Sequence, residues 1–181
     1  MINLLDYKID ESLKNVFGKN ISKEVVMFCV GNHKIWYDSF GPLVAEKLRY
    51  LGVSFYVYGG VDNTIVPDNL IEFMDFVETK HAGAIIVVID NCLATNKDEH
   101  LMLEIKQTGS TPAFFVNEKM FGNYSILLKV DTTAEPYEFL EKQNIIINTL
   151  ASKLQIHVEK LQKNAKKELY FTDNELKYYQ I

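Results

Sequence analysis

The sequence predicts an α/β protein, a three-layer αβα arrangement on a mostly parallel sheet of about five strands. Two observations lead there: three apolar runs suited to strands, at 25–30, 54–58 and 84–89, and helix-like segments at 41–51 and 67–80 between them. Continuous apolar runs are typical of strands that are covered on both faces. Because crossover connections are right-handed, the three strands are expected to be parallel, with helices on either side.

The flanking segments extend this pattern. A short amphipathic segment that ends at Gly18 precedes the first strand, and its apolar residues are Leu13, Val16 and Phe17. Beyond the third strand, residues 113–117 and 124–130 are short β-prone runs on either side of 118–122. We expect them to form a hairpin or a pair of edge strands.

A long helix is predicted from Pro136 onward, with an apolar stripe made of Leu140, Ile147, Leu150, Leu154, Val158 and Leu161. No repeat or flexible linker interrupts residues 20–160, so residues 1–163 are predicted to form one domain. Residues 164–181 are charged and rich in tyrosine, which indicates a C-terminal helix or a tail. Such a tail could pack on a second subunit and form a homodimer.

Composition excludes several classes of protein. Of the 181 residues 48% are hydrophobic and 24% charged, and the net charge is −5. A nucleic-acid partner is not expected, because phosphates require a basic face. The longest apolar run, 84–89, is too short to span a bilayer, and no signal peptide is visible at the N-terminus, so we expect no membrane association and a cytoplasmic location. Cys29 and Cys92 are too few for a disulfide framework.

Three acids follow the three predicted strands: Asp38, Asp62 and Asp90. In open parallel sheets, ligands bind outside the carboxyl ends of the strands, near the point where the strand order reverses. If the first strand is central, Asp38 and Asp90 come from neighbouring loops and approach within hydrogen-bonding or one-water distance. These two acids are therefore the candidate catalytic residues.

Two facing carboxyl groups suit general acid–base hydrolysis. Like charges in a shared, partly dry site do not both ionise easily, so one carboxyl group keeps its proton while the other activates water. We expect Asp38 to be the ionised member, because it lies just before the helix start at 41–42. There the helix dipole favours a negative charge by about 0.3–1 kcal/mol.

Other interpretations of these residues stay open. Asp38 and Asp90 could simply cap a strand end or a helix start, and Asp62 could be a turn former. The three acids could instead bind a divalent cation through oxygen, although hydrolysis by an acid pair needs no cofactor. Cys92 and His33 form a rival pair, because a thiolate and an imidazole after adjacent strands can perform nucleophilic catalysis.

Four segments resemble the YyaC-type sporulation proteins, namely 28–31 (Phe-Cys-Val-Gly), 38–44 (Asp-Ser-Phe-Gly-Pro-Leu-Val), 57–62 (Val-Tyr-Gly-Gly-Val-Asp) and 88–93 (Val-Ile-Asp-Asn-Cys-Leu). That family is similar in fold to the spore germination protease and the hydrogenase maturation proteases. The resemblance implies a phosphorylase/hydrolase-like fold, with carboxylates at the positions of Asp38 and Asp90. A nickel site like that of the hydrogenase maturation proteases is not expected, because Ser39 replaces its acid and no histidine stands between Lys106 and His157.

The resemblance and the acid pair together predict a peptidase-like hydrolase that acts on a peptide bond of a specific protein. The residues expected to contact the substrate are Gly31, Asn32, Ser39, Asp62, Asn91 and Cys92. The alternative is a catalytically inactive sporulation or assembly factor that binds a protein partner. It is favoured by departures from the family pattern, such as Ala94 in place of a glycine.

Overall fold

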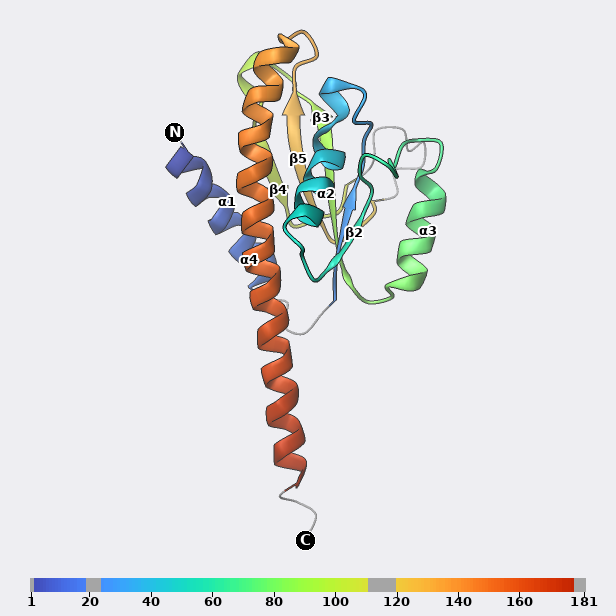
Figure 1. Cartoon of the computed structure of the whole chain (residues 1–181), viewed down its shortest axis with the longest axis vertical. Coiled ribbons are helices and arrows are strands. Elements are labelled where there is room, and N and C mark those ends of the chain that lie inside the picture. The colour runs from blue at the N-terminus through green and yellow to red at the C-terminus, as the bar shows by residue number, and fades with distance from the viewer. Residues whose placement is uncertain (1, 19–23, 111–119, 178–181) are drawn as a thin grey trace.

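A five-stranded sheet with the order β2-β1-β3-β5-β4 forms the middle layer of the computed structural model (Figure 1). The structure describes residues 2–18, 24–110 and 120–177, and the side chains of 6–18, 24–110 and 120–163. The strands are β1 (Val25–Cys29), β2 (Tyr56–Tyr58), β3 (Ile85–Leu93), β4 (Leu103–Lys106) and β5 (Tyr124–Val130). β1, β2, β3 and β5 are parallel, and β4 runs antiparallel to β5.

Helices cover both faces of this sheet, so the predicted three-layer αβα fold is confirmed. The helices are α1 (Ile2–Phe17), α2 (Phe40–Tyr50), α3 (Leu70–Lys80) and α4 (Pro136–Lys177), with short 3-10 turns η1 (Trp36–Asp38) and η2 (Lys97–Glu99). One core lies between the sheet and α1, α2 and α4, and a smaller core lies beneath α3 on the opposite face. Successive residues of β1 contribute to one core and then to the other, because side chains of a strand alternate between faces.

Two strand boundaries differ from the prediction. β2 comprises only Tyr56–Tyr58, so it begins two residues later than expected. β3 continues to Leu93 instead of ending before Asp90, because β5 pairs with it as far as the Leu93–Val130 register pair. The pairing of β3 with β1 nevertheless ends at Ile89, which leaves Asp90 at the point where β1 has finished.

The edge of the sheet beyond β5 was predicted only in part. The run at 124–130 is a strand as expected, but its antiparallel neighbour is β4 at 103–106. The other predicted strand, 113–117, lies outside the described residues. The sequence gives little signal for β4, because it has only four residues and two of them are charged.

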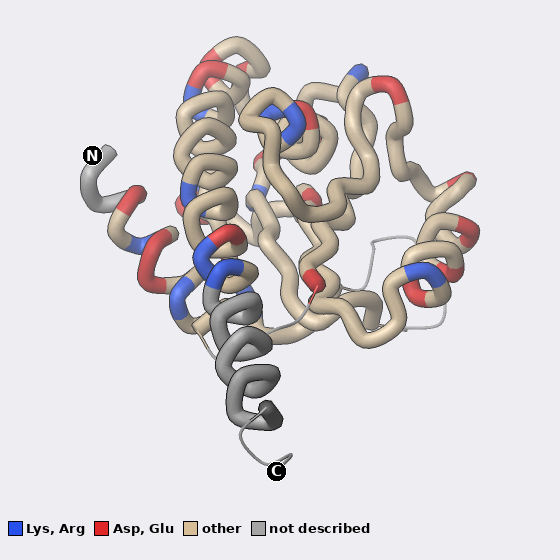
Figure 2. The backbone as a smooth tube through the Cα atoms, turned by 60° about the horizontal axis from the view of Figure 1, so that its bottom comes forward, with Lys and Arg blue, Asp and Glu red and all other residues tan. Residues whose placement is uncertain are grey.

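Helix α4 begins at Pro136, as predicted, and continues without interruption to Lys177. Leu140 was expected in its buried stripe, but 41% of it is exposed and Phe139 lies in the core instead. The other five residues of the predicted stripe are buried. None of the helices in the described ranges is long and apolar enough to cross a membrane. Acidic and basic positions are mixed along α1 and α4 (Figure 2).

Candidate functional site

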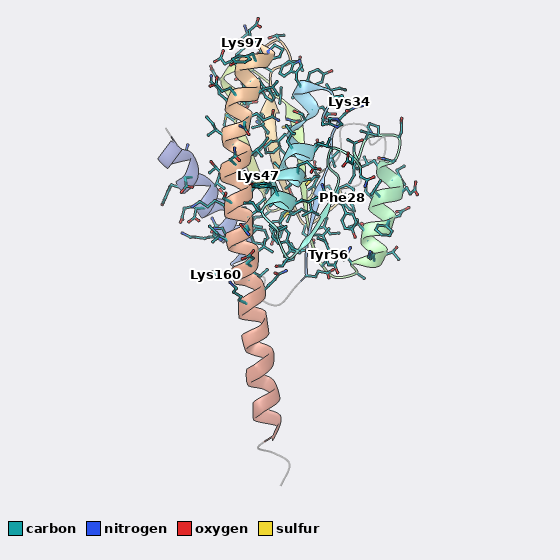
Figure 3. The ribbon with its side chains drawn as sticks, in the orientation of Figure 1. Phe28, Lys34, Lys47, Tyr56, Lys97 and Lys160 are labelled. Atoms are coloured by element: carbon teal, nitrogen blue, oxygen red, sulfur yellow. The ribbon has the colours of Figure 1, made fainter. Side chains whose placement is uncertain are left out.

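The carboxyl ends of β1 and β3 form the point at which the strand order reverses. These strands are neighbours, but the chain leaves β1 through α2 on one face and enters β3 through α3 on the other. Lys34, in the segment after β1, and Lys97, in the segment after β3, both lie at this end of the molecule, whereas Tyr56 lies toward the other end (Figure 3). The sheet therefore places the segments after β1 and β3 side by side, where open α/β sheets bind ligands.

Close packing of Gly41 holds the start of α2 against both strands. A Cβ atom on Gly41 would lie 2.1 Å from the carbonyl oxygen of Val30 and 2.7 Å from that of Ile89. The backbone N–H of Val30 also donates to the carbonyl oxygen of Ile89, at 2.8 Å. Because the helix approaches so closely, the turn that carries Asp38 is brought to the end of β3.

Asp38 lies at the end of η1 and is partly buried. The backbone N–H of Asn32 donates to both the carbonyl oxygen and the Oδ2 atom of Asp38, each at 2.9 Å. Burial raises the pKa of Asp38, and the hydrogen bond from Asn32 opposes this increase in part. Gly31 has a φ of +129°, and a Cβ there would lie 2.3 Å from the carbonyl oxygen of Asp38. Glycine thus allows this loop to close on itself.

Asp90 lies in β3 on the face toward α3, and only 8% of it is exposed. Its Oδ1 atom accepts a hydrogen bond from the backbone N–H of Asn91, at 2.7 Å. Burial raises the pKa of Asp90 to about 7, and the negative charge of Asp38 contributes to the same direction. Asp90 is therefore the weaker acid of the two.

Asn91 and Ser39 support the turn from the opposite face of the sheet. The Oδ1 atom of Asn91 accepts a hydrogen bond from the backbone N–H of Phe40, the first residue of α2, at 2.9 Å. Ser39 is buried, donates to the carbonyl oxygen of Trp36 at 2.9 Å, and lies 3.4 Å from Oε1 of Gln143. Both side chains thus position the residues next to Asp38. A contact of either with substrate stays a prediction.

Gln143 of α4 is a member of this region that the sequence interpretation missed. It is fully buried, and its Nε2 atom lies 3.3 Å from Oγ of Ser39. The sequence does contain a signal for Gln143: it is a polar residue on the side of the predicted helix that is otherwise apolar.

Asp62 does not join the acid pair. It is exposed in the turn that follows β2. Within the described ranges, no three His, Cys, Asp or Glu side chains are grouped so that they could hold a metal ion. The predicted three-acid cation site, built from Asp38, Asp62 and Asp90, is therefore not formed.

The rival pair of Cys92 and His33 is not joined by a hydrogen bond among the described residues. Cys92 is partly buried within β3, and burial raises the pKa of its thiol. Raising the pKa favours the neutral thiol over the reactive thiolate. The Nδ1 atom of His33 is buried without a hydrogen-bond partner. This pair lacks the hydrogen bond that would activate a nucleophile.

Three cavities of the described structure lie away from the acid pair. The first, of about 400 Å³, lies between α2 and α4 and is lined by residues that include Leu43, Tyr50 and Leu140. The second, of about 270 Å³, lies at the start of α4. The third, of about 210 Å³, lies between α1 and β4. Neither Asp38 nor Asp90 lines any of these three.

The electrostatic coupling of the pair can be measured directly. We expect the Asp90 carboxyl group to titrate with a pKa of about 7, observed by NMR of carboxyl carbons. In Asp38→Asn protein this pKa should fall only part of the way toward 3.8, because burial is the larger cause. An Asp90 pKa that does not change in Asp38→Asn protein would show that the two acids are not coupled.

The fold and the site define a three-layer αβα domain with a coupled pair of acids at the switch point of its sheet. The chain belongs to the DUF1256 family, described as "Protein of unknown function (DUF1256)", whose model matches residues 1–158. It is 28% identical over 91 residues to "Uncharacterized protein YyaC" of Bacillus subtilis (strain 168). The match covers 50% of this chain and 44% of that relative. The predicted membership of a YyaC-type family is confirmed.

Proposed function

We propose that this protein is a hydrolase that cleaves a peptide bond of a specific protein, with Asp38 and Asp90 as its catalytic residues. The observation that carries the proposal is the buried Asp90, whose pKa of about 7 differs from that of an ordinary aspartate. Strongly perturbed pKa values are concentrated at functional sites, and this one lies where α/β sheets bind ligands. The expected similarity of the family to the spore germination protease points to the same chemistry.

The two acids would take different roles below pH 7. Asp38, the stronger acid, accepts a proton from a water molecule while the water oxygen bonds to the peptide carbonyl carbon. Asp90 donates its proton to the carbonyl oxygen, which gives a neutral tetrahedral intermediate. On collapse, the C–N bond breaks, the amine leaves with the proton held by Asp38, and a hydroxyl proton of the intermediate returns to Asp90. One water is consumed, and both acids recover their starting states.

Cleavage can be tested on proteins extracted from the cells that produce this chain. Purified protein is incubated with the extract, and new protein N-termini are quantified by mass spectrometry. Asp38→Asn and Asp90→Asn should each lower the rate of cleavage at any specific site by about 10²–10⁴-fold, the range for loss of a general acid or base. Asp75→Asn, a change of an exposed acid on α3, is the matched control and should cleave normally.

New N-termini that appear equally with wild type and with both site variants would come from a contaminating protease and would refute the hydrolase. Circular dichroism of each variant establishes that it is folded.

A different observation favours a structural role for the two acids, which would leave the protein as a partner-binding factor without catalysis. Each carboxyl group already accepts a hydrogen bond from a nearby backbone N–H, Asp38 from Asn32 and Asp90 from Asn91. These bonds are also what a purely structural carboxyl group would make. If the protein binds a partner without catalysis, Asp38→Asn should leave the binding of that partner unchanged, and no cleavage should be observed with any variant.

A further inference from the structure

The outer edge of β4 is open for pairing in the part of the chain that the structure describes. β4 lies at one end of the strand order, and β5 is its partner on the inner side. The backbone N–H and C=O groups on the outer side of an edge strand form a template for another strand. Charged side chains usually prevent natural edge strands from pairing with other chains. The charges of β4 therefore determine which strands can pair with it.

The residues of β4 alternate between two different faces. Leu103 and Ile105 pack against the core formed with α1, α2 and α4. Glu104 and Lys106 lie on the other face, where they form an ion pair within the chain at 3.2 Å and 37% and 45% of their side chains are exposed. Any strand that joins this edge must keep apolar residues on the first face and polar residues on the second, because a shift by one residue would reverse the faces.

A second copy of β4 satisfies this requirement in one antiparallel register. When Ile105 lies opposite Ile105 of the second copy, Glu104 faces Lys106 of the second copy, and the twofold axis generates the same pair again. The two neighbouring registers that preserve the faces place Glu104 opposite Glu104 or Lys106 opposite Lys106. Like charges directly opposite each other destabilise a strand pair. The charge pattern therefore selects a single self-complementary register.

An apolar recess lies beside the same edge. The cavity of about 210 Å³ between α1 and β4 is lined by Lys8, Ile9, Ser12, Leu101, Met102, Leu103 and Ile105. Met102 is 50% exposed at this position. The recess adjoins the face of Leu103 and Ile105, so apolar side chains of an incoming β4 would reach it. Burial of apolar surface there would add to the energy of four-residue strand pairing.

We propose that two copies of this chain pair through β4, antiparallel and centred on Ile105, so that their sheets join into one ten-stranded sheet. The surface involved is small, so the pair dissociates on dilution. This contact is separate from the acid pair, which lies at the ends of β1 and β3, and from residues 164–181, for which a dimer contact was predicted from the sequence.

Charge exchange tests this arrangement on the full-length protein. Sedimentation equilibrium over a wide range of concentration should show a reversible monomer–dimer equilibrium. Glu104→Lys and Lys106→Glu should each weaken dimerisation by at least about tenfold, because each change places two like-charge pairs across the twofold axis. The double variant Glu104→Lys/Lys106→Glu restores opposite charges in the same register and should dimerise nearly as well as the wild type.

Glu99→Gln serves as the control for the charge network, since Glu99 contacts Lys129 on the adjacent β5 at 3.2 Å but does not lie on β4. Thermal unfolding of each variant separates loss of pairing from loss of folding. A monomer at all concentrations would overturn the proposal. So would a dimer that both single variants leave unchanged, since its contact would lie elsewhere, or a double variant no better at pairing than the single ones.

Discussion

Asp90→Asn protein should be more stable than the wild type at pH 8 by up to about 4 kcal/mol, and nearly equal to it at pH 4. The upper value follows from a pKa raised from 3.8 to about 7, at 1.36 kcal/mol for each unit. The asparagine keeps an oxygen that can accept the hydrogen bond from the backbone N–H of Asn91. It lacks the charge that burial disfavours.

The pH dependence follows from the protons that each state binds. Between pH 4 and pH 7, Asp90 is ionised in the unfolded chain but protonated in the folded protein, so the folded state binds more protons. Stability therefore decreases as pH rises through this window and levels off above pH 7. Asparagine at position 90 does not titrate, so the difference between variant and wild type should increase over the same window.

Urea unfolding at pH 4, 6 and 8 measures this difference. Asp75→Asn, which changes an exposed acid, controls for the general effect of removing one negative charge and should show no such increase. A constant difference between Asp90→Asn and wild type at all three pH values would mean that Asp90 ionises normally in the folded protein. That result would also remove the main support for a catalytic acid at this position.

Gly41→Ala should destabilise the protein by about 1–3 kcal/mol and disturb the acid pair. The added methyl group would lie 2.1 Å from the carbonyl oxygen of Val30 and 2.9 Å from its backbone nitrogen. Alanine favours a helix over glycine by about 1 kcal/mol. The clash outweighs this gain, because the atoms in contact belong to the backbone of β1 and move only if α2 shifts.

Gly41→Ala also tests whether the close packing of α2 controls the pKa of Asp90. Since α2 would move away from β1 and β3, the charge of Asp38 would act less on Asp90, and the pKa of Asp90 should fall. Gly52→Ala is the matched control: nothing lies within 4 Å of its Cβ position, but its φ of +65° is unfavourable for alanine. It should cost only about 1–2 kcal/mol and leave the pKa of Asp90 unchanged. Equal stability of Gly41→Ala and wild type would disprove the close packing of α2 against β1.

Most of the scaffold could be predicted from local patterns. The apolar runs at 25–30 and 84–89 are strands in the middle of the sheet, since continuous apolar runs are typical of strands that are covered on both faces. β4 was not predicted because it has only four residues and depends on pairing with β5. That partner strand begins 18 residues after β4 ends, so no local pattern indicates the pairing. Leu140 was assigned to the wrong side of α4 because a shift of one residue rotates a side chain by about 100° around the helix.

The sequence placed Asp38 and Asp90 near each other, and in the structure the charge of Asp38 does raise the pKa of Asp90; their catalytic role stays a prediction. Asp38 and Asp90 are coupled because β1 and β3 are neighbours, which the order of elements indicated. The predicted cluster with Asp62 is not formed, since sequence position after a strand does not determine where a turn projects. The supporting contacts of Asn91 with Phe40 and of Ser39 with Gln143 join residues 51 and 104 positions apart, and no local pattern predicts them.

The sequence by itself determined the αβα class, the direction of the central strands and the two acids at their ends, because periodicity and chain order control these features. Only the tertiary structure decided how far the pKa of Asp90 is raised and which strand lies at the edge of the sheet. Both depend on what lies nearby in space: burial and a neighbouring charge raise the pKa of Asp90, and β4 pairs with β5 at the end of the strand order.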